Sequence, residues 1–310
     1  MDTPVLPNTF IIGVQKAGTT TLDDWLAQHP QIYCYESLKD IHLFARFKTR
    51  AEIIERLKKE PAPYKNQPVV LQSAVNYIFY PQLLKAIAQF ERKAKLILIL
   101  RNPVDRAISS YGYFTKMLRE TRTIEEALIY EPKQVTEFSK DNSDFTYIEH
   151  GFYAKQIKSC LEYFPKEQLL VLDYDDLAKN PSLLLHNIFS FLGIDVSFKP
   201  DLTPRNVTGT VRNQFLQESI INKRGRTRKW VVDNLVDPIF PVAKRKLLKR
   251  KLFEMNTGKA TTGQASIHTA DEETVEKTKK QLAPYFYDDA KELDKMLQTK
   301  FYEKWFGNVS

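Results

Sequence analysis

Apolar residues along the chain alternate between two spacings, one typical of buried strands and the other of amphipathic helices. Strand-like apolar runs occupy residues 10–14, 31–35, 69–81, 94–100 and 168–172. After the helix that follows the first run, helical spacing of apolar residues recurs over residues 51–59, 83–90, 123–130, 151–164, 181–192, 271–282 and 288–305. Strands that alternate with helices predict an α/β fold with a central parallel sheet and helices on both faces.

A loop containing glycine joins the first strand to the first helix. Gly13 and Gly18 have the separation of the Walker A pattern, G-x-x-x-x-G-K-[ST], but Thr19 stands where that pattern has lysine. The cation of this loop is Lys16, two residues before Gly18. Because the first turn of a helix favours anions, we expect a phosphate loop whose cation lies on the loop itself. The alternatives are a P-loop kinase or NTPase, against which the missing lysine argues, and an ordinary turn with a solvated lysine.

A second candidate phosphate site follows the apolar run at residues 94–100. Arg101 comes directly after that run, and Asn102 and Pro103 open a helix that carries Ser109. Ligands bind at the carboxyl ends of strands in open α/β sheets, and arginine offers fixed paired donors to phosphate. We expect Arg101 and Ser109 to bind phosphate; the alternative for Arg101 is a surface ion pair with Asp105.

These two segments together resemble a known family. Residues 15–20 resemble the 5′-phosphosulfate loop of the sulfotransferases that use 3′-phosphoadenosine 5′-phosphosulfate (PAPS), and residues 95–111 resemble their 3′-phosphate motif. Residues 40–44 and 76–77 are similar to the glycosaminoglycan-type and bacterial branches. The resemblance implies a P-loop-like three-layer fold and PAPS as the sulfuryl donor. The donor-binding residues that it implies are Gln15, Lys16, Ala17, Gly18, Thr19, Thr20, Arg101 and Ser109.

The resemblance also implies a catalytic base. In the glycosaminoglycan-type enzymes a glutamate takes the acceptor's proton, and Asp40 falls on its position, with His42 two residues later. Since aspartate is shorter by one methylene, His42 is the alternative base; a helix-capping Asp40 and a core histidine are the plainer interpretations. Some relatives carry a lysine, near the transferring sulfuryl group, where this chain has Ser73, and either Lys16 or Lys39 is expected to replace its charge.

Several further residues match the family more loosely. Asn76, Tyr77 and Tyr153 are candidates for the acceptor pocket, although core packing suits both tyrosines. Gly209 and Arg212 are candidates for a loop over the 3′-phosphate, and His268 lies in a polar stretch, 256–270, predicted to be a mobile loop. The basic runs at 223–229 and 244–251 are most simply solvated; docking of an anionic acceptor or an acidic carrier domain is the alternative.

Composition narrows the class of protein. The formal net charge is +8, which an anionic donor explains in part, so we expect no nucleic-acid partner. Cys34 and Cys160 cannot build a disulfide framework, and no His or Cys pair has metal-ligand spacing, so we expect a cytoplasmic, metal-independent protein. No apolar run approaches the roughly 18 residues of a membrane span, and no signal peptide precedes the first strand. We therefore expect no stable membrane anchor.

Domain organisation and function follow from these points. No linker divides the chain, so we expect one domain over residues 1–310 with a helical C-terminal part from about 215. The predicted activity is sulfuryl transfer from PAPS to a hydroxyl or amine of a small molecule, a glycan or an intermediate tethered to a carrier. A non-catalytic nucleotide-binding module is the remaining alternative, and neither the acceptor nor the oligomeric state follows from the sequence.

Overall fold

The computed structural model describes residues 5–35, 38–59, 64–129, 137–139, 144–203 and 271–307. Several predictions lie outside these residues, so the structure does not bear on them. They concern Gly209, Arg212, His268, the stretch 256–270 and both basic runs. The single-domain prediction likewise stays a prediction.

Five parallel strands form the centre of the fold in the order β2-β3-β1-β4-β5. The strands are β1 (Thr9–Gly13), β2 (Ile32–Cys34), β3 (Val69–Ser73), β4 (Lys95–Leu100) and β5 (Leu169–Asp173). All residues of β1 and β3 are buried, as are all but the first of β4, because helices cover both faces. The prediction of a parallel α/β sheet is confirmed.

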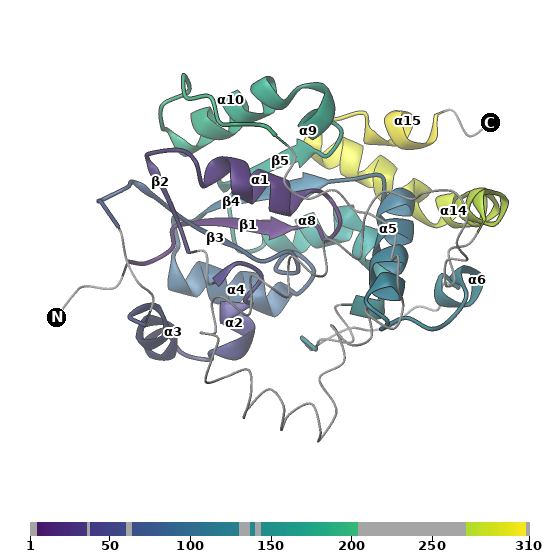
Figure 1. Cartoon of the computed structure of the whole chain (residues 1–310), viewed down its shortest axis with the longest axis horizontal. Coiled ribbons are helices and arrows are strands. Elements are labelled where there is room, and N and C mark those ends of the chain that lie inside the picture. The colour runs from purple at the N-terminus through teal and green to yellow at the C-terminus, as the bar shows by residue number, and fades with distance from the viewer. Residues whose placement is uncertain are drawn as a thin grey trace, which may run out of the picture.

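Helices lie on both sides of this sheet. In Figure 1 α1 (Thr19–Leu26) and α10 (Pro181–Leu192) lie above the strands, and α4 (Pro81–Phe90) lies below them. The remaining longer helices are α3 (Arg50–Leu57), α5 (Pro103–Lys116), α8 (Tyr153–Leu161) and α14 (Glu272–Leu297). The short ones are α2 (Leu43–Arg46), α6 (Ile124–Ala127), η2 (Glu149–Gly151), η3 (Lys166–Gln168), α9 (Asp176–Lys179) and α15 (Phe301–Phe306).

Local sequence explains where several helices begin and end. Thr49 and Glu52 form a capping box at the start of α3, and the Asn102 side chain accepts from the first turn of α5. Gly193 ends α10 in the left-handed conformation that suits glycine. The caps of α3 and α5 lie in the segments that follow β2 and β4, which also carry candidate site residues.

The C-terminal helices differ from the prediction. We expected two helices over 271–282 and 288–305, but a single helix, α14, runs across Pro284, and α15 is short. Leu282, Phe286 and Leu293 are buried at helical spacing, and this packing outweighs the backbone hydrogen bond that proline removes. The region 69–81 also holds a shorter strand than expected, because β3 ends at Ser73.

A pair of hydrogen bonds joins α14 to the start of α8. The Asp289 carboxylate accepts hydrogen bonds from the backbone of Ala154 and Lys155 at the start of α8, at 3.0 and 3.4 Å. Burial raises the pKa of Asp289 to about 6. The carboxylate thus occupies the N-terminus of α8, where negative charge is favoured.

Candidate active site

The loop after β1 leaves a helix N-terminus open. Gly18 precedes the first residue of α1 with φ +77°, and no side chain caps this end. A Cβ at Gly18 would lie 3.2 Å from the Tyr174 ring, so both the backbone angle and the close approach call for glycine. The side chains of Ala17 and Thr19 are buried, and that of Thr20 is exposed. The free N–H groups of this turn suit an anion.

Lys16 lies on this loop among other cations. Its backbone has φ +69°, and its ammonium lies 4.1 Å from the centre of the Tyr113 ring. Burial, and then the charge of Arg101, lowers the pKa of Lys16 to about 8. Among the described residues, no carboxylate pairs with this ammonium. A lysine held in this way gains from a bound anion.

The second motif meets the first at this loop. Arg101 Nη1 donates to the Lys16 carbonyl oxygen at 3.0 Å, and its guanidinium lies 4.7 Å from the Tyr174 ring centre. The ion pair with Asp105 that we considered is not formed, since Asp105 lies 3.5 Å from Lys279 instead. The two predicted phosphate segments therefore lie side by side.

The hydroxyl that contacts the loop is not the expected one. Ser110 Oγ donates to Gln15 Oε1 at 3.0 Å, which joins α5 to the loop, while Ser109 is half-buried one position earlier. Arg106, earlier on α5, is fully buried, and two of its guanidinium nitrogens, Nε and Nη1, have no hydrogen-bond partner in the described part of the chain. Sequence reasoning missed Ser110 and Arg106, because helix spacing alone does not fix which polar residues face the loop.

Asp40 and Lys39 lie in the segment that follows β2. The backbone of Asp40 has φ +59°, its N–H donates to the Ser73 carbonyl at 2.9 Å, and its side chain keeps access to solvent. Burial of the carboxyl group raises the pKa of Asp40. The charge of Lys39 lowers it, and the charge of Asp23 raises it again. The helix-capping alternative is wrong, since α2 begins at Leu43 and its N-cap residue is His42, not Asp40.

Lys39 is bound to two carboxylates. Its ammonium lies 2.8 Å from Asp23 and 2.9 Å from Asp24, and the Ser73 hydroxyl donates to Asp23. Burial alone would lower the pKa of Lys39, but these two partners raise it. Lys16 and Lys39 are the two lysines expected to replace the charge missing at Ser73. Lys39 already pairs with two carboxylates, whereas Lys16 pairs with none among the described residues.

His42 is neutral and largely enclosed. Burial lowers its pKa to about 4, and its Nε2 is buried without a hydrogen-bond partner among the described residues. The imidazole lies 4.7 Å from the Phe138 ring centre and 5.7 Å from that of Tyr77. A neutral imidazole with one open nitrogen is able to accept a proton or to bind a hydroxyl.

The three candidates for the acceptor pocket are buried. The Tyr77 hydroxyl accepts from the Leu43 N–H at 3.0 Å, and the Tyr153 hydroxyl donates to the Arg101 carbonyl at 2.8 Å. Tyr77 is fully buried, Tyr153 is 1% exposed and Asn76 is 3% exposed. Both tyrosines therefore pack in the core, as the alternative interpretation had it, and Tyr153 supports the backbone of Arg101.

Tyr113 is the aromatic residue that sequence reasoning missed. Its side chain is 36% exposed beside Lys16, and its pKa is raised by burial and then by the charge of Asp40. Tyr113 therefore contacts Lys16 and lies close enough to Asp40 for the charge of that carboxylate to act on it. Its position four residues after Ser109 was a usable indication, because residues four apart share one face of a helix.

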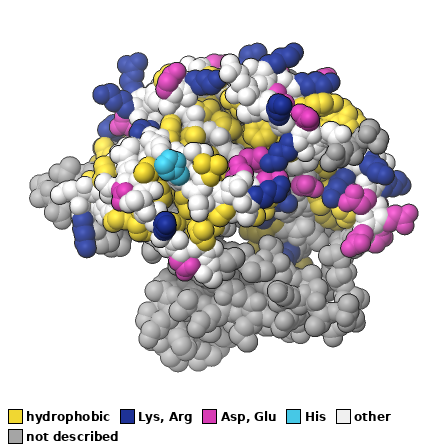
Figure 2. Space-filling view, turned by 90° about the horizontal axis from the view of Figure 1, so that it is seen from above, with side chains coloured by type: hydrophobic (Ala, Val, Ile, Leu, Met, Phe, Trp, Pro, Cys, Tyr) yellow, Lys and Arg dark blue, Asp and Glu magenta, His cyan; other side chains and the backbone are white. Residues whose placement is uncertain are grey.

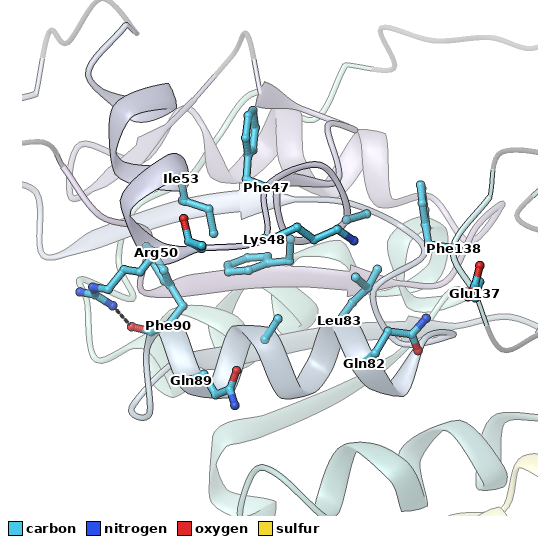
Figure 3. A pocket seen from close by; sticks show the side chains of 14 residues that line it. Phe47, Lys48, Arg50, Ile53, Gln82, Leu83, Gln89, Phe90, Glu137 and Phe138 are labelled. Carbon is cyan, nitrogen blue, oxygen red and sulfur yellow. Dashed lines mark hydrogen bonds between the residues drawn. The ribbon is translucent and has the colours of Figure 1, made fainter.

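A cavity of about 630 Å³ is lined in part by Phe138, the residue whose ring contacts His42. Figure 3 shows it between the segment that carries Phe47 and Lys48, helix α4 with Gln82 and Leu83, and the Phe138 ring. Phe138 also contacts the His42 ring, so one side chain borders both the cavity and the candidate base.

Carboxylates at the end of β5 do not form a metal site in the described part of the chain. Asp173 and Asp175 both pair with Lys304. Within that part no three His, Cys, Asp or Glu side chains gather closely enough to hold a metal ion. Metal independence stays a prediction.

Charged side chains elsewhere are dispersed. Figure 2 shows lysine and arginine side chains distributed around the visible face, with acidic side chains between them.

None of the helices in the described ranges has the length and apolar character required to cross a membrane.

The sheet order and the loop after β1 define a P-loop-like α/β protein. The sulfotransferase domain family model matches residues 6–229. The chain therefore belongs to the sulfotransferase family, and the predicted family is confirmed.

Individual relatives agree with this assignment. The chain is 26% identical over 297 residues to membrane-associated sulfotransferase kil1 of Dictyostelium discoideum, covering 70% of this chain and 62% of the relative. It is 30% identical over 196 residues to mouse heparan sulfate glucosamine 3-O-sulfotransferase 5, covering 61% and 54%. The chain thus spans between about half and two thirds of the length of these relatives.

A solved structure is also similar. The crystal structure of a sulfotransferase from Alicyclobacillus acidocaldarius superposes with a TM-score of 0.55 at 25% identity, over 73% of this chain and 99% of that one. The likeness extends over nearly the whole of that protein and agrees with the family assignment.

Proposed function

We propose that this chain transfers a sulfuryl group from PAPS to a hydroxyl, or an amine, of an acceptor and releases 3′-phosphoadenosine 5′-phosphate (PAP). The acceptor atom forms a bond to sulfur, the bond from sulfur to the bridging phosphate oxygen breaks, and the acceptor's proton passes to a base. The hydrogen bond from Arg101 to the Lys16 carbonyl carries the proposal, because it joins two segments suited to the two phosphates of one nucleotide.

Each end of the donor has its own partners in this proposal. The backbone of residues 17–20 and the Lys16 ammonium hold the 5′-phosphosulfate, and Arg101 with Ser109 holds the 3′-phosphate. Lys16 neutralises the charge that grows on the bridging oxygen as the bond to sulfur breaks. Gly209 and Arg212 stay candidates for the 3′-phosphate.

Asp40 is the base in this proposal. Its raised pKa makes it more basic than an ordinary aspartate, and it keeps the solvent access that an acceptor needs. His42 is the second candidate; its pKa of about 4 keeps the imidazole neutral at pH 7 but also makes it a weak base, which favours Asp40.

Tyr113 positions Lys16. A lysine ammonium over a ring face is held by the ring's negative face without any charge being neutralised. Tyr113 therefore keeps the ammonium in the site while leaving its full charge available to the donor.

The proposal leaves the acceptor class open among compounds that carry a hydroxyl or an amine. The heparan sulfate relatives act on a glycan, as their names state, and we propose a glycan, a small molecule or a carrier-tethered intermediate for this chain. The cytoplasmic location and the absence of a nucleic-acid partner stay predictions. Fractionation of the source cells tests the location.

Direct assay tests the proposal. The intact chain is incubated with PAPS and a panel of hydroxyl and amine acceptors, and mass spectrometry detects an added sulfuryl group; calorimetry measures binding of PAP. Transfer together with PAP binding supports the proposal. PAP binding without transfer to any acceptor favours the non-catalytic module, and magnesium-dependent binding of ATP in place of PAP favours a kinase or NTPase.

A further inference from the structure

The cavity beside His42 has the size of a small-molecule site. Its volume of about 630 Å³ lies inside the roughly 300–1,000 Å³ of typical ligand pockets. The segment from α2 to the first turn of α3 forms one wall, and the outer face of α4 forms the other. The phosphate loop takes no part in its lining.

Aromatic rings form much of the interior. Phe44 and Phe90 are almost fully buried at its base with ring centres 5.4 Å apart, and Phe47 and Phe138 are half-buried at its sides. Rings that keep an accessible face bind flat apolar surfaces, such as an aryl ring or the carbon face of a sugar. The interior therefore favours a ligand with such a surface.

One cation reaches into this space. Figure 3 shows the Lys48 side chain extending across the cavity below Phe47, while Arg50 turns away to the Phe90 carbonyl. Among the described residues no carboxylate lies within ion-pair distance of the Lys48 ammonium. In Figure 3 the Lys48 ammonium points toward Phe138, Glu137 lies beyond Phe138, and Arg50 lies at the opposite end of the lining.

One lining residue also contacts a candidate base. Phe138 lines the cavity and its ring centre lies 4.7 Å from that of His42, which is two residues from Asp40. Phe138 therefore connects the cavity to the segment that carries both candidate bases.

We propose that this cavity holds the part of the acceptor beyond its reacting hydroxyl, and that this part combines a flat apolar surface with an anionic group that pairs with Lys48. This rests on the proposed sulfuryl transfer. It specifies an acidic, ring-containing acceptor in place of a neutral one.

A matched pair of probes isolates the charge. The glucuronide and the glucoside of 4-methylumbelliferone share an aryl ring and a sugar, and they differ by a carboxylate in place of a hydroxymethyl group. Binding of each to the PAP-loaded chain is measured by ligand-detected NMR, and sulfuryl transfer from PAPS is measured by mass spectrometry. We expect the glucuronide to bind about three- to fivefold more tightly, the range for a partly exposed charge pair.

Variants assign the preference to the cavity. Lys48→Met should make the two probes equal, and Lys48→Glu should reverse their order. Phe47→Ala should weaken both about tenfold and keep their ratio. The control is Lys58→Met, since Lys58 is an exposed lysine at the end of α3 outside the lining, and it should keep the wild-type preference.

The results separate this inference from the activity itself. Loss of the glucuronide preference in Lys48→Met, with PAP affinity unchanged, supports the site. Failure of either probe to bind, a preference that survives Lys48→Met, or one that Lys58→Met also removes would overturn it while PAP binding stands. Absence of PAP binding to the wild-type chain would instead refute the proposed function.

Discussion

The loops that follow the carboxyl ends of β1 and β2 each carry a lysine, and the charges around these two lysines are opposite in sign. Lys16, after β1, has no carboxylate partner among the described residues, and its pKa falls to about 8. Lys39, after β2, lies between Asp23 and Asp24, and its pKa rises. Lys16 is thus surrounded by cations, whereas Lys39 is paired with two carboxylates.

This difference indicates which lysine is available for an anion. A cation already paired with two carboxylates gains little from a phosphate, because it would have to give up partners of similar strength. A cation surrounded by other cations gains the full interaction. Charge type alone therefore does not identify the functional lysine, whereas its partners do.

The largest effect is expected at Lys16. Lys16→Met should lower turnover about 100- to 1000-fold, because charge on the bridging oxygen is then left unneutralised. The same change should raise the stability of the ligand-free protein by on the order of 1 kcal/mol at pH 7, after allowance for solvent screening. Steady-state assays and thermal unfolding measure the two effects.

The pH dependence provides a control for that stability gain. Lys16 has a folded pKa near 8, below its ordinary value of 10.5, so the unfolded chain binds more protons between these two values. The advantage of the methionine variant should be complete below pH 8 and disappear by about pH 10.5. An advantage that is the same at pH 7 and pH 10.5 would contradict the assigned cause.

The next largest effect separates the two candidate bases. Asp40→Asn should lower turnover about 100-fold or more, whereas His42→Gln should cost less, because Asp40 is the solvent-accessible group. Asparagine suits the backbone at φ +59°, so unfolding should change little. Turnover measured across pH 5–9 tests the order, and a larger loss at His42 would transfer the role to the histidine.

A smaller effect is expected at Tyr113. Tyr113→Leu should lower turnover about three- to tenfold, because the ring that holds the ammonium is lost, and Tyr113→Phe should restore most of it. Affinity for PAP measured against pH checks the cause, since only the leucine variant should shift the pH at which binding weakens. Equal loss in both variants would point to the hydroxyl instead.

The smallest effect on turnover is expected at Lys39. Lys39→Met should change turnover no more than about threefold, yet it should destabilise the fold by about 1–3 kcal/mol, because Asp23 is buried and loses its partner. Thermal unfolding beside the turnover assay checks this opposite pattern. A large loss of turnover in a stable variant would show that Lys39 acts in the reaction.

The sequence was sufficient for the features that depend on local pattern. Apolar runs located the strands, and the spacing of Gly18 and Lys16 located the loop, because both follow from neighbouring residues. The meeting of Arg101 with Lys16 followed from the rule that ligands bind at strand ends.

What could not be predicted depends on contacts between distant segments. The pairing of Lys39 with Asp23 and the contact of Ser110 with Gln15 depend on how α1 and α5 pack on the sheet. The continuation of α14 through Pro284 depends on buried neighbours far away in the chain. The local propensities of neighbouring residues cannot predict any of these contacts.

The contact of Asp289 with the start of α8 has a consequence for the two ends of the chain. Asp289 fixes the first turn that carries Tyr153, and Tyr153 in turn holds the carbonyl of Arg101. A chain that stopped before residue 271 would lose this contact, and the backbone of Arg101 would lose support although β4 itself is unchanged. The C-terminal helix α14 thus supports the backbone of Arg101, which contacts the loop after β1 near the N-terminus.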